Sequence, residues 1–361
     1  MMNKAFLISG GGTGGHIFPA LAIGKALQLK YPNARIEFVG AKDKMEMQKV
    51  PEAGFKIHGL WISGIDRKIS LRNLAFPFKL MSSIYTSYRL VKKIKPNVVI
   101  GVGGFASGPL LFVANTLGIP TVIQEQNSYP GITNRLLAKR ADRICTGMPN
   151  MERFFSRDKV VQTGNPIRVD VTQVAESKEE AKQHFGLDGS KPMVLIIGGS
   201  LGARTINLAI ENGHKRLAEK NIQVLWQTGK FYNTVNDVLG AQTTFIKEMG
   251  LAYRAADVIV SRAGASSISE ICAVGGAAIL VPSPNVSEDH QTKNARSLVD
   301  HNAAMLVKDS AAADELIAEV LKLLSNPIQI KTFSEAARGL ARPNATNEII
   351  STISSLMPNQ E

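Results

Sequence analysis

The sequence SGGGTGGHIFPA, residues Ser9–Ala20, follows the short apolar run Ala5–Ile8 and indicates how the chain should begin to fold. The apolar run predicts a buried strand, and the six residues Gly10–Gly15, all Gly or Thr, predict a tight turn into a helix. Glycine lets a ligand approach the backbone closely, and the N–H groups at a helix N-terminus attract anions. We therefore expect an anion-binding turn that ends at His16.

Apolar stretches alternate with helix-length amphipathic stretches along the whole chain. They predict strands at Ala5–Ile8, Ile36–Val39, Val98–Val102, Thr121–Ile123, Arg143–Cys145, Val160–Thr163, Met193–Ile197, Val224–Gln227, Thr244–Ile246, Val258–Val260, Ala278–Val281 and Ala304–Val307. Short apolar strands separated by helices are typical of parallel sheets covered on both faces. The expected fold class is α/β, with two doubly wound, Rossmann-like domains facing a cleft, where ligands bind at the carboxyl ends of the strands.

The two halves of the chain carry similar strand–turn–helix signals. The stretch FLISGGGTGG from Phe6 is matched by LIIGGSLGA from Leu195, and NVVIGVGGFASGP from Asn97 is matched by DVIVSRAGASSIS from Asp257. The pattern breaks at GNPIRVD (Gly164–Asp170), after which a polar, helix-prone stretch follows. These observations predict one domain over residues 1–165 and a second over 166–342.

Composition favours a globular cytoplasmic protein with a sizeable core. The chain has 361 residues, 44% of them hydrophobic, and its two cysteines are far apart, so no disulfide framework is expected. We expect no signal peptide, because the first residues lack its apolar core, and no membrane span, because no apolar run reaches the length of about 18–20 residues that spans a bilayer.

Positive charge is concentrated in the first half. The net charge is +12, and residues 1–165 hold 23 Lys and Arg against 9 Asp and Glu, whereas residues 166–361 hold 19 against 21. Residues 67–95 carry eight basic and no acidic side chains, interleaved with apolar residues at helical spacing. This segment fits either an anionic membrane surface or an ordinary amphipathic surface helix with solvated lysines. No recognition-helix or stacking-aromatic motif supports nucleic acid as a partner.

The glycines also match a dinucleotide-binding pattern. Gly10, Gly12 and Gly15 have the G-x-G-x-x-G spacing, but that fingerprint needs an acidic residue at the end of the second strand. The second strand ends at Phe38–Gly40, and Asp43 lies further along. A nicotinamide-dependent oxidoreductase is therefore disfavoured.

Seven motifs in order resemble one family across nearly the whole chain. They are GGTGGHIFPA (Gly11–Ala20), GVGGFASGP (Gly101–Pro109), QEQN (Gln124–Asn127), GNPIR (Gly164–Arg168), GGSLGA (Gly198–Ala203), SRAGASSISEI (Ser261–Ile271) and EDHQTKNA (Glu288–Ala295). The chain resembles the bacterial UDP-N-acetylglucosamine:N-acetylmuramyl-(pentapeptide) pyrophosphoryl-undecaprenol N-acetylglucosamine transferases. The resemblance implies the two-domain glycosyltransferase B fold.

The resemblance implies an inverting transfer of N-acetylglucosamine from UDP-GlcNAc to the C4 hydroxyl of N-acetylmuramic acid in lipid I, giving lipid II and UDP. The first domain would meet lipid I and the inner leaflet of the cell membrane, and the second would bind UDP-GlcNAc. A C-terminal helix at about residues 343–361 would pack back on the first domain. Cell-wall synthesis and division proteins are possible partners.

Sugar transfer needs a base for the acceptor hydroxyl and stabilisation of the departing diphosphate. The sequence contains no Asp-x-Asp motif, so no metal and no cofactor are expected. By resemblance His16 or Glu125 is the base, and both remain open. Where the family often has a histidine before Glu-Gln-Asn, this chain has Gln124, so a histidine there cannot be essential.

The resemblance also implies the ligand-binding residues. The acceptor pyrophosphate would lie on Thr13, Gly14, Gly15, Gly103 and Gly104. The donor-binding residues would be Thr13, Gly14, Gly15, Asn127, Arg168, Ser200, Ile246, Ala265, Ser266, Ser267, Ile268, Ser269, Glu270 and Gln291. Within that set, Arg168 and Ser200 would bind the diphosphate, Ile246 uracil, Glu270 the ribose, and Gln291 and Asn127 the sugar. Arg204 and Arg262 are possible helpers at the diphosphate.

Two other functions remain as alternatives. One is a UDP-N-acetylglucosamine epimerase on the same fold, which would need no lipid acceptor. The other is a nonenzymatic UDP-sugar- or lipid-binding membrane protein, which would bind UDP-GlcNAc without releasing UDP.

Overall fold

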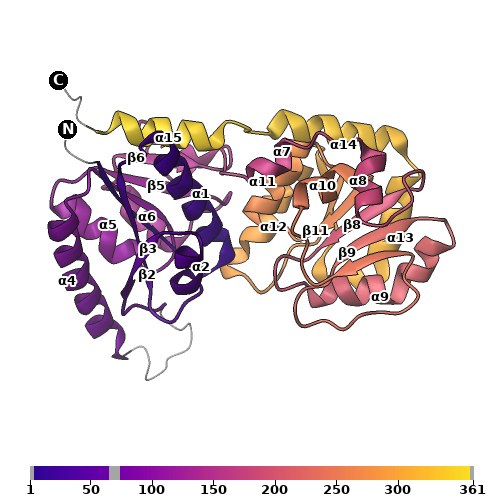
Figure 1. The fold of residues 1–361 in the computed structure, drawn as a ribbon, viewed down its shortest axis with the longest axis horizontal. Helices are drawn as coiled ribbons and strands as arrows, with labels where there is room; N and C mark the ends of the chain where they lie inside the picture. The colour runs from indigo at the N-terminus through magenta and orange to yellow at the C-terminus, as the bar shows by residue number, and fades with distance from the viewer. Residues whose placement is uncertain (1–3, 65–73, 358–361) are drawn as a thin grey trace. The chain divides into compact units, whose positions relative to one another are not determined.

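The computed structural model describes residues 4–64 and 74–357 and divides into two compact units. The first unit comprises Met1–Pro166 together with Asn344–Glu361, and the second comprises Ile167–Pro343. Each is built around one parallel sheet with helices on both faces (Figure 1). Residues 67–73 of the basic segment lie outside the described residues.

The first unit has a seven-stranded sheet in the order β3-β2-β1-β4-β5-β6-β7. Its strands are β1 (Ala5–Gly10), β2 (Arg35–Ala41), β3 (Lys56–Leu60), β4 (Val98–Gly103), β5 (Thr121–Glu125), β6 (Arg143–Thr146) and β7 (Val160–Val161). Its helices are α1 (Gly14–Lys30), α2 (Glu46–Glu52), α4 (Phe76–Ile94), α5 (Ser107–Thr116), α6 (Ile132–Ala138) and α15 (Ala345–Ser355). The strand order reverses at β1, between β2 and β4, which is where doubly wound sheets bind ligands.

The alternation of side chains along β1 builds two cores. Phe6 and Ile8 point to one face and pack with residues of α1 and α15, whereas Leu7 points to the other face and packs with residues of α4 and α5. The terminal helix α15 contributes Ile349 and Ile353 to the first of these cores. Tyr31 Oη and Ser354 Oγ lie 2.8 Å apart, which joins the end of α1 to α15.

The second unit has a six-stranded parallel sheet in the order β10-β9-β8-β11-β12-β13. Its strands are β8 (Met193–Ile197), β9 (Gln223–Gln227), β10 (Gly240–Thr243), β11 (Val258–Ser261), β12 (Ala278–Leu280) and β13 (Ala304–Leu306). Its helices are α7 (Val169–Thr172), α8 (Lys178–His184), α9 (Arg204–Ala218), α10 (Met249–Ala255), α11 (Ala265–Val274), α12 (His290–Val299), α13 (Ala312–Leu324) and α14 (Pro327–Leu340). Here the strand order reverses at β8.

Two edge strands differ from the sequence prediction. β3 (Lys56–Leu60) was not predicted, because its residues KIHGL contain no continuous apolar run. The predicted strand Thr244–Ile246 is wrong: the strand is β10 (Gly240–Thr243), and residues 244–246 follow it as a loop.

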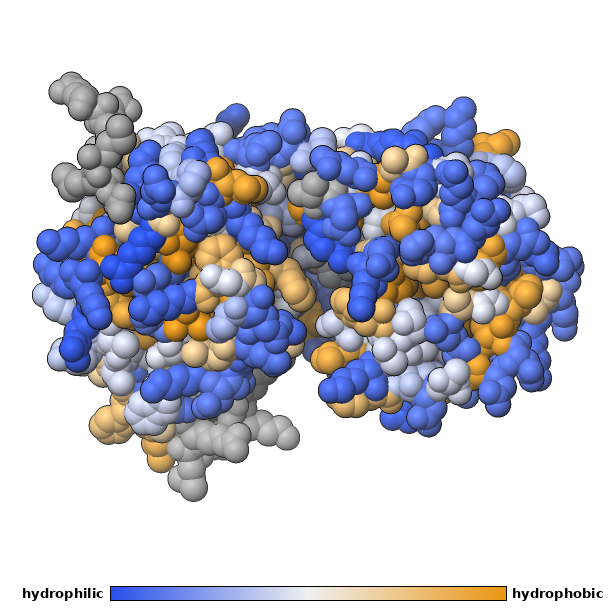
Figure 2. All heavy atoms as spheres, viewed as in Figure 1, coloured by the Kyte–Doolittle hydropathy of each residue, from blue (hydrophilic) through white to orange (hydrophobic). Residues whose placement is uncertain are grey.

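Helix α4 is strongly amphipathic, as the basic apolar segment predicted. It buries Ser83, Ser87, Val91 and Ile94 against the first unit. No helix among the described residues is both long and apolar enough to cross a bilayer. Figure 2 shows hydrophobic colouring at the surface near the start of α4.

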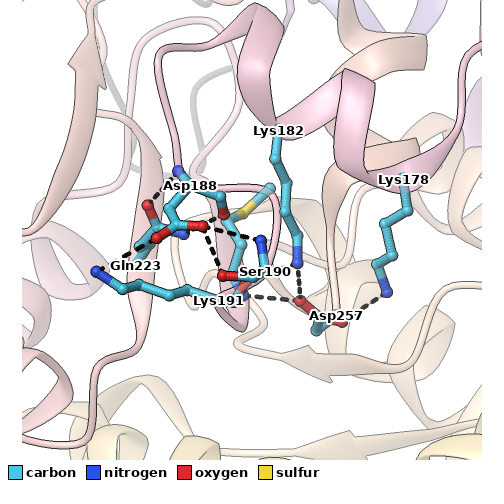
Figure 3. A network of polar contacts seen from close by, with 8 residues as sticks. Lys178, Lys182, Asp188, Ser190, Lys191, Gln223 and Asp257 are labelled. Atoms are coloured by element: carbon cyan, nitrogen blue, oxygen red, sulfur yellow. Dashed lines mark hydrogen bonds and ion pairs between the residues drawn. The ribbon is translucent and has the colours of Figure 1, made fainter.

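An ion-pair network fastens α8 to the second sheet (Figure 3). Asp257, which directly precedes β11, accepts from Lys178 Nζ at 2.6 Å, Lys182 Nζ at 3.0 Å and the Met193 N–H at 2.8 Å. Burial raises the pKa of Asp257, but the hydrogen bonds and charges of these three partners together outweigh burial. The pKa therefore lies below its ordinary value of 3.8.

The stability that Asp257 supplies should therefore depend on pH. A carboxyl group with a lowered folded-state pKa stabilises the fold above its unfolded pKa, about 3.8, and loses that effect as pH falls through the folded value. Asp257→Asn should lower the free energy of unfolding at pH 7 by about 1–2 kcal/mol. The difference from wild type should shrink below pH 4 in denaturant titrations. The exposed Asp300→Asn is the control, and an equal pH dependence in both variants would contradict the assignment.

Candidate active site

The two glycine turns predicted for the first unit lie against each other. The Gly10–Gly15 turn joins β1 to α1, and the Gly103–Gly104 turn joins β4 to α5; the Gly11 N–H donates to the Gly103 carbonyl at 3.3 Å. Gly104 has φ +90°, and a Cβ atom there would lie 2.5 Å from the Gly11 carbonyl oxygen. Thr13 and Gly15 are exposed beside this contact. The close approach of the two backbones therefore requires glycine.

His16 lies at the start of α1 and its ring packs on Gly103, where a Cβ atom would be 2.6 Å from His16 Cδ2. Its Nδ1 is 3.1 Å from the Gly11 carbonyl oxygen and 3.4 Å from Thr13 Oγ1. Because a carbonyl oxygen only accepts, the first contact places the proton of a neutral ring on Nδ1 and the lone pair on Nε2. The side chain is partly exposed.

Glu125 has a different environment at the end of β5. It is only 2% exposed and its two oxygens accept from four donors: the Asn127 N–H, Asn127 Nδ2, the Gly131 N–H and Asn134 Nδ2. Burial raises the pKa of Glu125, while these hydrogen bonds oppose that rise. The carboxylate thus holds the loop that carries Asn127. Gln124 is fully buried and donates to Asn165 Oδ1 at 3.0 Å.

Sequence reasoning missed Glu46, a buried carboxylate on α2. Glu46 Oε2 accepts from the Gly12 N–H at 2.9 Å, and Oε1 accepts from the Ala41 N–H at 3.0 Å. A Cβ atom on Gly11 would lie 2.2 Å from Glu46 Oε1. Glu46 therefore braces the Gly10–Gly15 turn from a position 34 residues away, where no local motif marks it.

In the second unit the Gly198–Gly202 turn leads from β8 into α9. Gly199 and Gly202 both have positive φ, +85° and +78°, and the Gly202 N–H donates to the Gly199 carbonyl at 3.0 Å. A Cβ atom on Gly202 would lie 2.1 Å from the Thr228 carbonyl oxygen. Ser200 and Arg204 are exposed at this turn, as an anion-binding role requires.

The turn from β11 into α11 lies beside it, because β8 and β11 are neighbouring parallel strands. Gly264 is the N-cap and has no side chain with which to bond the N–H groups of the first helical turn. Ser266 and Ser267 are partly exposed there, whereas Ala265 and Ile268 are buried. Ile268 donates its N–H to Gly264, and Ser269 Oγ donates to the Ala265 carbonyl, so these residues support the turn from within.

Arg168 and Glu270 lie in contact within the second unit. Arg168 Nε is 3.3 Å from Glu270 Oε1, and Tyr253 Oη donates to Glu270 Oε2 at 3.1 Å. Burial raises the pKa of Glu270, and the Arg168 charge opposes the rise. Tyr253, a buried residue on α10, is a second residue that sequence reasoning missed.

Two further predicted donor residues are already hydrogen-bonded. The Ile246 N–H donates to Gln227 Oε1 at 2.9 Å, so this N–H group is already paired within the protein. Gln291 Oε1 accepts from the Ser283 N–H at 2.8 Å, which holds the side chain at the start of α12.

Arg262, one of the two predicted helpers at the diphosphate, makes its contacts within the second unit. Its Nη1 donates to the Val281 carbonyl at 3.0 Å and the Pro282 carbonyl at 3.2 Å, and it pairs with Asp309. The guanidinium therefore fixes the loop after β12. Among residues 4–64 and 74–357, no three His, Cys, Asp or Glu side chains are grouped as metal ligands would be.

Comparisons with known proteins agree along the whole chain. Residues 6–146 match the glycosyltransferase family 28 N-terminal domain, and residues 193–349 match the family 28 C-terminal domain. The UDP-N-acetylglucosamine--N-acetylmuramyl-(pentapeptide) pyrophosphoryl-undecaprenol N-acetylglucosamine transferase of Flavobacterium psychrophilum is 50% identical over 100% of both chains. The transferase of the same name from Cytophaga hutchinsonii is 52% identical over 96% of this chain and 95% of its own.

The crystal structure of Acinetobacter baumannii MurG superimposes with a TM-score of 0.78 at 28% identity, covering 98% of this chain and 99% of that one. Two Rossmann-like sheets with glycine turns at their reversal points are the architecture of the glycosyltransferase B fold, which confirms the predicted fold class. The chain belongs to glycosyltransferase family 28, in the family of these N-acetylglucosamine transferases.

Glu46→Gln should loosen the first glycine turn. The amide keeps one acceptor oxygen and turns an NH2 group toward the second backbone N–H, which leaves that buried donor unsatisfied. We expect the free energy of unfolding to fall by about 1–3 kcal/mol in denaturant titrations. Glu52→Gln on the same helix, which removes an exposed ion pair to Lys49, should cost under about 1 kcal/mol. Equal losses in the two variants would rule out the bracing role.

Proposed function

We propose that this chain transfers N-acetylglucosamine from UDP-GlcNAc to lipid I, giving lipid II and UDP in peptidoglycan synthesis. The observation that carries the proposal is 50% identity over the full length of a transferase named for this reaction. Family 28 membership favours a transferase over an epimerase or a nonenzymatic binding protein.

The reaction is a displacement with inversion at the anomeric carbon of the donor sugar. The C4 hydroxyl oxygen of N-acetylmuramic acid forms the new bond, the bond to UDP breaks, and its electron pair leaves on the β-phosphate oxygen. The hydroxyl proton goes to a base on the enzyme. The departing diphosphate is stabilised by backbone N–H groups and cationic side chains, without a metal ion.

We assign the base role to His16 rather than Glu125. The contact of Nδ1 with the Gly11 carbonyl places the proton of the neutral ring on Nδ1 and the lone pair on Nε2, and the same carbonyl stabilises the imidazolium that forms. Glu125 is buried and its oxygens already accept four hydrogen bonds, which supports a positioning role for the loop that carries Asn127.

We assign ligand binding to two pairs of glycine turns, one pair in each unit. In the first unit, Thr13–Gly15 with Gly103 and Gly104 hold the acceptor pyrophosphate. In the second, the Gly198–Gly202 turn, Ser200, Arg168 and the start of α11 hold the donor diphosphate. Glu270 accepts from the ribose hydroxyls, Ile246 binds uracil, and Gln291 and Asn127 contact the sugar.

We further propose that the first unit rests on the inner leaflet of the cell membrane, where a lipid-linked acceptor is reached. Phe78, Met81 and Tyr85 recur at i, i+3 and i+7 on α4 and are exposed. Arg89 lies over the Tyr85 ring and Lys92 over the Tyr88 ring, so positive charge borders this apolar stripe. Such a helix binds anionic lipid through apolar burial and charge together. Cell-wall synthesis and division proteins as partners stay a prediction.

Release of UDP from UDP-GlcNAc should require a lipid I analogue and should persist in EDTA. His16→Ala should lower kcat by about 10²–10⁴-fold and abolish the loss of rate on the acid side of the pH profile. Glu125→Gln should lower activity but keep the loss of rate on the acid side of the pH profile. The control is His184→Ala, which removes an exposed histidine on α8 and should leave both the rate and the pH profile unchanged.

The outcome that contradicts the transferase is UDP-GlcNAc binding without acceptor-dependent UDP release. Conversion of UDP-GlcNAc to another sugar nucleotide without acceptor would then identify an epimerase. An unchanged acid limb in His16→Ala would remove His16 as the base.

Phe78→Ser should weaken binding to anionic phospholipid vesicles about tenfold, since partial burial of a phenylalanine is worth more than 1 kcal/mol. Phe231→Ser is the matched control, because Phe231 is 79% exposed and Phe78 is 72% exposed, but Phe231 lies in the second unit. Sedimentation with vesicles measures both, and equal losses would place the membrane contact elsewhere.

A further inference from the structure

One buried side chain joins the two loops to which diphosphate and uracil binding are assigned. Gln227 ends β9 and is 2% exposed. Its Nε2 donates to the Gly199 carbonyl at 2.9 Å, and its Oε1 accepts from the Ile246 N–H at 2.9 Å. The first contact is on the turn after β8 and the second is on the loop after β10, so a single amide spans both.

The chemistry of the contact requires an amide. One partner is a carbonyl, which needs a donor, and the other is an N–H group, which needs an acceptor. A carboxylate would satisfy only the N–H group and would face the Gly199 carbonyl with negative charge. The Gly199 carbonyl also accepts from the Gly202 N–H at 3.0 Å, so Gln227 helps to set the orientation of the peptide groups in this turn.

We propose that Gln227 is a positioning residue for the nucleotide half of the donor. It holds the diphosphate turn and the uracil loop at a fixed spacing, so that both contacts to UDP form together. This inference rests on the proposed function and on the assignment of Ser200 and Ile246 to the donor. Loss of Gln227 should then weaken UDP-GlcNAc binding while leaving binding of the lipid acceptor unchanged.

The same strand provides a matched control. Gln223 begins β9, points to the same face of the sheet four residues earlier, and is 4% exposed. Its Oε1 accepts from the Asp188 N–H at 2.8 Å and its Nε2 donates to the Asp188 carbonyl at 2.9 Å (Figure 3). Gln223 therefore makes the same two kinds of bond to backbone, but at the amino end of the strand, away from the glycine turns.

The test compares Gln227→Met with Gln223→Met. Both variants lose the two hydrogen bonds of a buried side chain and should lose similar stability in denaturant titrations. Gln227→Met alone should raise the KM for UDP-GlcNAc and the calorimetric Kd for UDP about tenfold, with the KM for a lipid I analogue unchanged. Gln227→Glu should bind UDP no better than Gln227→Met.

A wild-type Kd for UDP in folded Gln227→Met would overturn the inference, as would an equal rise in Gln223→Met. If Gln227→Met does not fold, Gln227→Asn carries the test, because its shorter amide cannot reach both loops. Failure of the proposed function would be seen separately, as a wild-type protein that binds UDP but shows no acceptor-dependent UDP release.

Discussion

The candidate active site depends on one constraint, which is the close contact between backbone segments without side chains at the point where the strand order of each sheet reverses. In the first unit the Gly11 N–H meets the Gly103 carbonyl, and no Cβ atom fits at Gly104. In the second, no Cβ atom fits at Gly202 against the Thr228 carbonyl. Because the turns approach so closely, the N–H groups beside them are held in place before any ligand arrives. Pre-organised donors of this kind stabilise an anion without the cost of reorientation.

Each turn is supported by one buried polar side chain from an element far along the chain. Glu46 accepts two backbone N–H groups in the first unit, and Gln227 accepts one and donates one in the second. The carboxylate of Glu46 accepts from two backbone N–H groups, whereas the amide of Gln227 joins an N–H group and a carbonyl. The two halves of a duplicated pattern thus use chemically different supports for similar glycine turns.

The central strands, the glycine turns and the position of His16 at the start of a helix could be predicted, because apolar runs and glycine spacing are local signals. The edge strands β3 and β10 could not be predicted, because a strand at the edge of a sheet needs fewer apolar side chains and so leaves no apolar run in the sequence. In β3, Lys56 and His58 instead contact the carboxylate of Glu37. Glu46, Gln227 and Tyr253 were missed because their roles arise only when distant segments meet. The contacts of Arg262 with Asp309 and two backbone carbonyls could not be predicted for the same reason, because they join the end of β11 to later loops.

The position of α15 has a consequence for how the protein is made. The core beside α1 includes Ile349, Ile350 and Ile353, so the first unit is assembled from both ends of the chain. Residues 167–343, by contrast, form the second unit as one uninterrupted segment. During synthesis the second unit can complete its core while the first still exposes the apolar surface that α15 will cover. The part of the protein that is translated first therefore cannot complete its core until its last helix has been made, and until then it exposes apolar surface of the kind that promotes aggregation.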